Sequence, residues 1–116
     1  LLGGLLAPLA LVMGVPWSEA TEVGALIGVK TVLNEFLAYQ DLAGAMADGR
    51  LSPRSATIAA YALCGFANFG SLAILLGGIQ GIAPERRTEA ASLGLRSILA
   101  GTIATCMTGC LAGLIV

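Results

Sequence analysis

The chain has 116 residues, of which 57% are hydrophobic and only 11% are charged. Soluble domains carry about 25% charged residues, so the composition excludes an ordinary water-exposed surface and indicates an α-helical integral membrane protein. Seven acidic and six basic side chains leave a net charge of −1, which excludes the basic surface that nucleic-acid binding requires.

The first segment, residues 1–17, is apolar up to Val15 and closes with Pro16 and Trp17. A membrane-spanning helix needs about 20 apolar residues, and tryptophan is enriched at the membrane–water interface. We therefore expect residues 1–17 to be the end of a preceding helix followed by an interfacial turn, within a larger protein.

The second segment, residues 18–48, is long enough to cross a bilayer but carries Lys30, Asn34 and Glu35 at its middle. A helix facing lipid would not tolerate two charges and an amide at that depth. Division of its apolar part, Glu22–Ala47, near Asn34 gives two arms of about 12 residues, each too short to span. The sequence therefore predicts a re-entrant helical hairpin, followed by a polar turn at residues 49–54.

The third segment, residues 55–83, has no charged residue but is interrupted near its centre. Gly65 and Gly70 bracket Asn68 there, and the interruption runs from Gly65 to Ser71. Each half of about 12 residues would be roughly 18 Å long, which places the interruption near the middle of the bilayer. We expect a broken transmembrane helix with its break beside a cavity.

The last segments are a polar turn at residues 84–89 and a helix at residues 90–116, in which Arg96 is the only charge. Small residues recur in this helix at every fourth position: Gly101, Thr105, Gly109 and Gly113. Such a stripe lets another helix approach closely. The sequence therefore predicts a transmembrane packing helix.

Catalytic and metal chemistry lack the residues they need. The chain has no histidine, and its three cysteines, Cys64, Cys106 and Cys110, lie in apolar runs without metal-ligand spacing. There is no nucleophile with a base, no carboxylate pair and no phosphate loop. We expect no enzyme activity, no metal ligands and no cofactor.

Glu35 is the first candidate binding residue, because a carboxylate inside a membrane is expensive and usually functional. It can accept hydrogen bonds from two adjacent hydroxyls of a sugar. The alternative is a buried salt bridge, either with Lys30 five residues earlier or with an arginine outside these residues.

Asn68, Ser71 and Phe66 are the candidates at the helix break. An amide both donates and accepts, so Asn68 suits a polar neutral ligand, or it braces the unwound backbone. Ser71 contacts the ligand or bonds back to a carbonyl in its own helix. Phe66 lies against a flat ring, or packs against lipid or protein.

Three strings carry a family resemblance: GVKTVLNEFLAY at Gly28–Tyr39, LSPRS at Leu51–Ser55 and ALCGFANF at Ala62–Phe69. In order and spacing, from about Pro16 to the end of the chain, they closely resemble the concentrative nucleoside transporter family. The resemblance implies a sodium-coupled nucleoside symporter and an all-α membrane fold. This chain would be the C-terminal part of the transporter and one of its inverted-repeat halves.

The resemblance also implies roles for the candidate residues. Glu35 and Asn68 would contact ribose hydroxyls, Ser71 would contact the sugar, and Phe66 would line the pocket. Sodium, the coupling ion, would bind in an N-terminal repeat outside this chain, and the protein would be a homotrimer in the cell membrane, either plasma or inner. The alternatives are a carrier of another polar solute and a structural membrane subunit without transport.

Overall fold

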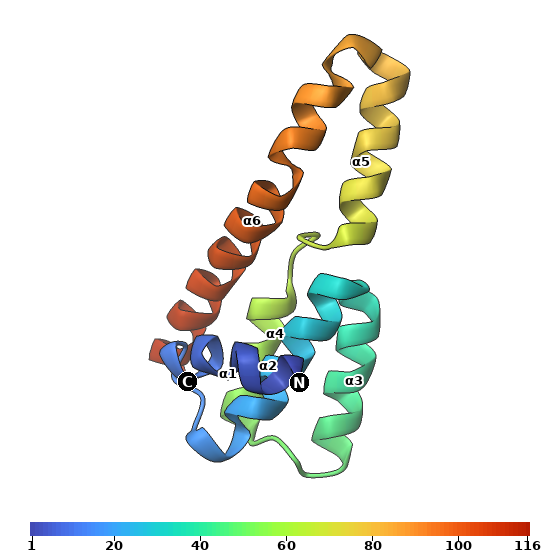
Figure 1. Ribbon diagram of the computed structural model, residues 1–116. Coiled ribbons are helices and arrows are strands. Elements are labelled where there is room, and N and C mark those ends of the chain that lie inside the picture. Colours follow the sequence, from blue (N-terminus) through green and yellow to red (C-terminus); the bar gives the residue numbers. More distant parts are fainter.

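The computed structural model describes residues 1–116, and all of its regular structure is helical. In Figure 1, α1 to α4 gather at one end, α5 extends toward the other end, and α6 returns antiparallel to α5 along the whole length of the molecule. The molecule measures 49 × 25 × 24 Å. The elements are α1 (Leu2–Val12), α2 (Trp17–Val32), α3 (Glu35–Ala47), α4 (Pro53–Leu63), α5 (Phe69–Ile82), the 3-10 turn η1 (Pro84–Arg86) and α6 (Arg87–Ile115).

Helix α1 folds back on α2, and the two axes are bent by 115° at the connection. Gly14 takes a φ of +93° in that connection, a conformation that favours glycine. The helices pack backbone to backbone, because a Cβ atom on Gly24 would lie 2.5 Å from the carbonyl oxygen of Gly3. Segment 1–17 thus contains a separate short helix before the turn.

Helices α2 and α3 form a hairpin whose interruption is only Leu33 and Asn34. The side-chain oxygen of Asn34 accepts a hydrogen bond of 3.0 Å from the backbone N–H of Leu37. Asparagine is a strong N-cap because this bond satisfies an N–H that lacks a partner in the helix. Asn34 therefore begins α3, and Glu35 is its first residue.

Helices α4 and α5 are separated by residues 64–68, which are not helical. The sequence placed this interruption at Gly65–Ser71, but α5 already begins at Phe69 because Asn68 caps it. On the α4 side of the interruption, Tyr39 of α3 donates a hydrogen bond of 2.7 Å to the carbonyl oxygen of Ala60, in the last turn of α4. The hairpin thus contacts the end of α4.

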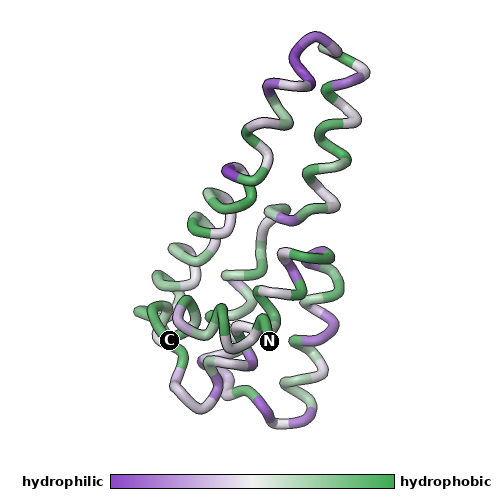
Figure 2. The backbone as a smooth tube through the Cα atoms, viewed as in Figure 1, coloured by the Kyte–Doolittle hydropathy of each residue, from purple (hydrophilic) through white to green (hydrophobic).

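The polar turn is also shorter than residues 84–89, because α6 begins at Arg87 directly after η1. Arg86 pairs with Glu89 at 2.9 Å across the start of this helix, which supports an earlier first turn. By length and composition, Pro84–Ile115 is the one unbent helical stretch able to cross a membrane. Figure 2 shows hydrophilic segments at both ends of the molecule and at the hairpin tip.

The stripe of small residues on α6 is confirmed as a packing surface. Added Cβ atoms would lie 2.8 Å from Ala67 at Gly101, 2.7 Å from Met13 at Gly109 and 2.4 Å from Met13 at Gly113. Helix α4 packs along the same stripe, since Ala62 and Ile58 also lie against Gly109. The stripe therefore holds α6 against both α4 and the break.

Candidate functional site

The hairpin tip and the helix break meet in a hydrogen bond between Asn68 and Glu35. The amide nitrogen of Asn68 donates to Glu35 Oε2 over 3.0 Å. Glu35 is the first residue of α3, and Asn68 is the residue before α5. We refer to these two residues as the tip–break pair.

Asn68 is held from both ends of its amide. Its oxygen accepts a hydrogen bond of 2.7 Å from the backbone N–H of Ser71, which caps α5. The side chain is almost fully enclosed, with 1% of its surface exposed. An amide nitrogen has two N–H donors, and only one has a protein acceptor. Asn68 braces the backbone and keeps one donor free.

Glu35 is half-buried and also keeps binding capacity, because only Oε2 has a protein partner. The salt bridge to Lys30 does not form: no ion pair within 4.0 Å includes either residue. Lys30 instead donates to the hydroxyl of Thr105 on α6. Within this chain, the Glu35 carboxylate therefore has no cationic contact.

Two helix N-termini converge on the tip–break pair. Asn34 and Asn68 cap α3 and α5 with the same geometry, each with its side-chain oxygen bound to an N–H three residues later. The N-terminus of a helix carries a partial positive charge of about half an elementary charge. This field favours a ligand oxygen placed beside the tip–break pair.

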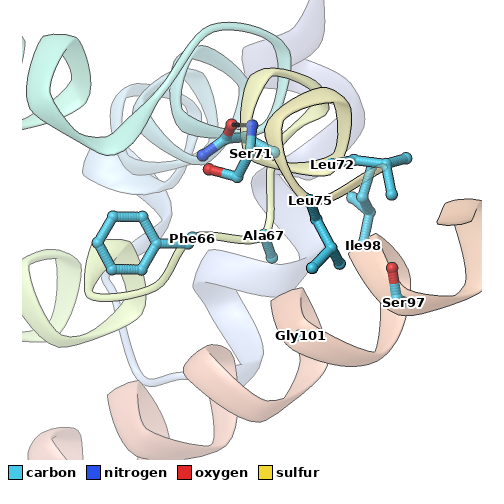
Figure 3. Close-up of a pocket in the computed structure, with 9 residues that line it drawn as sticks. Phe66, Ala67, Ser71, Leu72, Leu75, Ser97, Ile98 and Gly101 are labelled. Carbon is cyan, nitrogen blue, oxygen red and sulfur yellow. Dashed lines mark hydrogen bonds between the residues drawn. The ribbon is translucent and has the colours of Figure 1, made fainter. Parts of the chain in front are cut away.

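A cavity of about 360 Å³ opens between α5, the break and α6, beside the tip–break pair. Asn68, Ser71 and Phe66 line it, but Glu35 does not. The remaining lining residues are Ala67, Leu72, Leu75, Ser97, Ile98 and Gly101. Figure 3 shows Leu72 and Leu75 entering from α5 and facing Ser97 and Ile98 on α6.

Ser71 and Phe66 occupy different parts of this cavity. The Ser71 hydroxyl makes no hydrogen bond to the protein, so the back-bond to its own helix is absent and the group remains free for another partner. Phe66 is 76% exposed, and its ring points away from Leu72 and Ile98 (Figure 3). Its ring therefore lies at the edge of the cavity.

The sequence prediction missed the contribution of α6 to the cavity. It assigned this helix to packing alone, yet Ser97, Ile98 and Gly101 form one wall. Ser97 lies four residues before Gly101 and extends the spacing of the small-residue stripe by one position. This continued four-residue spacing is the feature of the sequence from which Ser97 could have been predicted as a residue of the cavity wall.

Comparison with known proteins identifies relatives along the whole chain. A family model described as "Na+ dependent nucleoside transporter C-terminus" matches residues 1–113. The uncharacterized transporter YutK of Bacillus subtilis is 47% identical over all of this chain and 28% of its own length. The nucleoside permease NupC of Helicobacter pylori is 40% identical over the same shares. Human solute carrier family 28 member 3 is 42% identical over 93% of this chain and 18% of its own length.

Solved structures match the arrangement of the helices as well. CNTnw in an inward-facing substrate-bound state superposes with a TM-score of 0.91 and 47% identity, over 97% of this chain and 28% of that protein. A doubly substituted CNTnw in an outward-facing state gives a TM-score of 0.90 and 46% identity over the same shares. The chain therefore spans between a quarter and a third of these structures.

Proposed function

Because the chain belongs to the concentrative, Na⁺-dependent nucleoside transporter family and matches its C-terminal part, we propose that it is the substrate-binding C-terminal segment of a sodium-coupled nucleoside symporter. It spans 28% of the length of the permease NupC. Transport itself belongs to the whole protein, and this segment contributes half of the substrate site.

The hydrogen bond within the tip–break pair is the observation that carries this proposal. It brings the charged tip of one element to the capping residue of another, beside an open cavity. Glu35 Oε1, the second N–H of Asn68 and the hydroxyl of Ser71 have no protein partners. A carboxylate accepts from hydroxyls and an amide donates to them, so this set fits the hydroxyl groups of ribose.

Phe66 supplies the apolar part of the proposed site. Its ring is largely exposed and stands at the cavity edge, on the same segment as Asn68. Flat rings stack against aromatic side chains with a gain of about 1 kcal/mol. Phe66 is thus placed to cover a nucleoside whose sugar is held by the tip–break pair.

In the bilayer, α2 and α3 form the re-entrant hairpin, α4 and α5 form the broken transmembrane helix, and α6 spans as the packing helix. The lengths support this arrangement: α2 and α3 have 16 and 13 residues, and α6 has 29. At 1.5 Å per residue, only α6 exceeds the thickness of about 30 Å by itself. The protein is a multi-pass protein of the cell membrane.

The segment moves as one unit during transport. Support comes from its near-equal similarity to CNTnw facing inward and facing outward, with TM-scores of 0.91 and 0.90. Sodium binds in the N-terminal repeat outside this chain and raises the affinity for nucleoside, and linkage requires nucleoside to raise the affinity for sodium equally. The whole protein assembles as a homotrimer.

Replacement of Glu35 by glutamine in the full-length transporter tests the sugar role. Sodium-driven uridine uptake should show a KM increased roughly tenfold or more, because the charge-assisted bonds to hydroxyls are lost. Glu85→Gln is the matched control, since Glu85 lies in η1, far along the chain from the tip–break pair. Unchanged KM in Glu35→Gln would remove Glu35 from the site.

A further inference from the structure

Lys30 is the largest side chain in the molecule that is fully enclosed, with 0% of its surface exposed. It lies in the last turn of α2, five residues before Glu35. A buried ammonium is costly unless hydrogen bonds compensate for the lost water. Since Lys30 has no ion pair in this chain, its single polar contact needs an explanation.

That contact is the hydroxyl of Thr105 on α6, at 3.3 Å from Lys30 Nζ. Thr105 donates its own hydrogen to the carbonyl oxygen of Thr102 over 3.0 Å. A hydroxyl has one donor and two acceptor lone pairs, so this second bond turns the lone pairs of Thr105 toward an incoming donor. Thr105 is therefore arranged as an acceptor for the ammonium.

Thr105 also touches the helix break. A Cβ atom on Gly65 would lie 2.6 Å from Thr105 Cγ2, so the backbone of the break rests directly on the threonine methyl group. Gly65 precedes Asn68 by three residues, and Lys30 precedes Glu35 by five. One side chain of α6 thus contacts the segments that lead into both members of the tip–break pair.

We propose that Lys30 is a positioning residue for the sugar site. Its ammonium fastens the end of α2 to Thr105, and Thr105 supports the break through Gly65. Together these contacts fix the distance between the hairpin tip and the break, so that Glu35 and Asn68 stay in register. The carboxylate oxygens of Glu35 meanwhile remain free of the cation. This role rests on the function proposed above.

The test uses Lys30→Met and Thr105→Val in the full-length transporter, with Thr105→Ser as the control that keeps the hydroxyl. For each variant, the KM of uridine is compared with that of 2′,3′-dideoxyuridine, which lacks the two ribose hydroxyls. Lys30→Met and Thr105→Val should each raise the uridine KM roughly tenfold, the size of one hydrogen bond to a charged group. The KM of the dideoxy compound should change less than twofold. Thr105→Ser keeps the acceptor for Lys30 but loses the methyl group beside Gly65, so it should raise the uridine KM less than Thr105→Val does.

A purely structural role for Lys30 predicts a different pattern, in which the KM of uridine and the KM of the dideoxy compound rise together. That result, or parental selectivity in both variants, would overturn the proposal. If Lys30→Met does not reach the membrane, Thr105→Val decides, because valine has the shape of threonine without the acceptor. If Lys30→Met and Thr105→Val keep the parental selectivity for uridine while Glu35→Gln has a raised uridine KM, only the proposed role of Lys30 is excluded. An unimpaired Glu35→Gln removes Glu35 from the sugar site, and with it the pairing on which the role of Lys30 rests.

Discussion

Asn68 joins Glu35 to the start of α5, because one amide donates to the carboxylate over 3.0 Å and accepts from the backbone of Ser71 over 2.7 Å. The same side chain therefore decides where α5 begins and what stands beside the hairpin tip. Ligand contact and backbone bracing at this position are compatible, since they use different atoms of the amide.

The two functions of Asn68 are separable by substitution. Serine also caps helices, whereas alanine does not, and loss of a cap costs about 1 kcal/mol. We expect Asn68→Ser and Asn68→Ala both to raise the uridine KM, because each removes the amide N–H that donates to Glu35. Only Asn68→Ala should also lower the melting temperature of the purified transporter. Equal melting temperatures in the two variants would contradict the capping role.

Asn34 should affect the hairpin tip in the same way. Asn34→Ala removes the acceptor for the N–H of Leu37, with an expected cost of about 1 kcal/mol in the stability of the first turn of α3. Hydrogen exchange at the Leu37 amide should become faster, while Asn34→Ser should exchange like the parent. Protection that survives in Asn34→Ala would mean that α3 begins without this cap.

Gly65 leaves no room for a side chain at the break. The methyl group of Gly65→Ala would lie 2.6 Å from Thr105 Cγ2, and overpacking of this kind costs about 1–3 kcal/mol. Thr105→Ser removes that methyl group, so the double variant should regain the melting temperature that Gly65→Ala loses. Gly78→Ala is the control, because no atom lies within 4 Å of its added Cβ. A double variant as unstable as Gly65→Ala would exclude this contact as the cause.

The sequence was sufficient for the elements whose chemistry is local. Charges at Lys30 and Glu35 within an apolar segment indicated the hairpin, and glycines around Asn68 indicated the break. Both asparagines are strong N-caps, so the exact start of α5 at Phe69 was also within reach. The predicted break is too long because it includes Gly70 and Ser71, which lie within α5 after the cap at Asn68.

Contacts between segments that are far apart in the chain could not be predicted from the sequence in the same way. Lys30 and Thr105 are 75 positions apart in their hydrogen bond, and nothing local distinguishes that partner from Glu35, which is five residues away. From the five-residue spacing alone, a salt bridge between Lys30 and Glu35 remained an alternative. Only the packing of α6 behind both the hairpin and the break determines which oxygen the ammonium reaches.

Glu19 gives a final test, at the end of the hairpin opposite its tip. Its carboxylate accepts hydrogen bonds from the hydroxyl and the backbone N–H of Ser52, at 3.0 and 3.2 Å, and Ser52 caps α4. Glu22, one turn later, pairs with the exposed Arg50. Hydrogen bonds to a charged group contribute about 1.5–3 kcal/mol, whereas exposed ion pairs contribute about 0–1 kcal/mol.

Glu19→Gln should therefore lower the melting temperature of the full-length transporter more than the chemically identical change Glu22→Gln. The loss follows because glutamine presents a neutral acceptor to both donors of Ser52 and weakens the link between the starts of α2 and α4. The uridine KM should stay within about twofold in both variants, because neither residue lines the cavity beside the tip–break pair. A twofold change in KM corresponds to about 0.4 kcal/mol of binding free energy. A larger effect of Glu22→Gln on melting would show that the exposed pair, and not the Ser52 contact, holds the base of the hairpin.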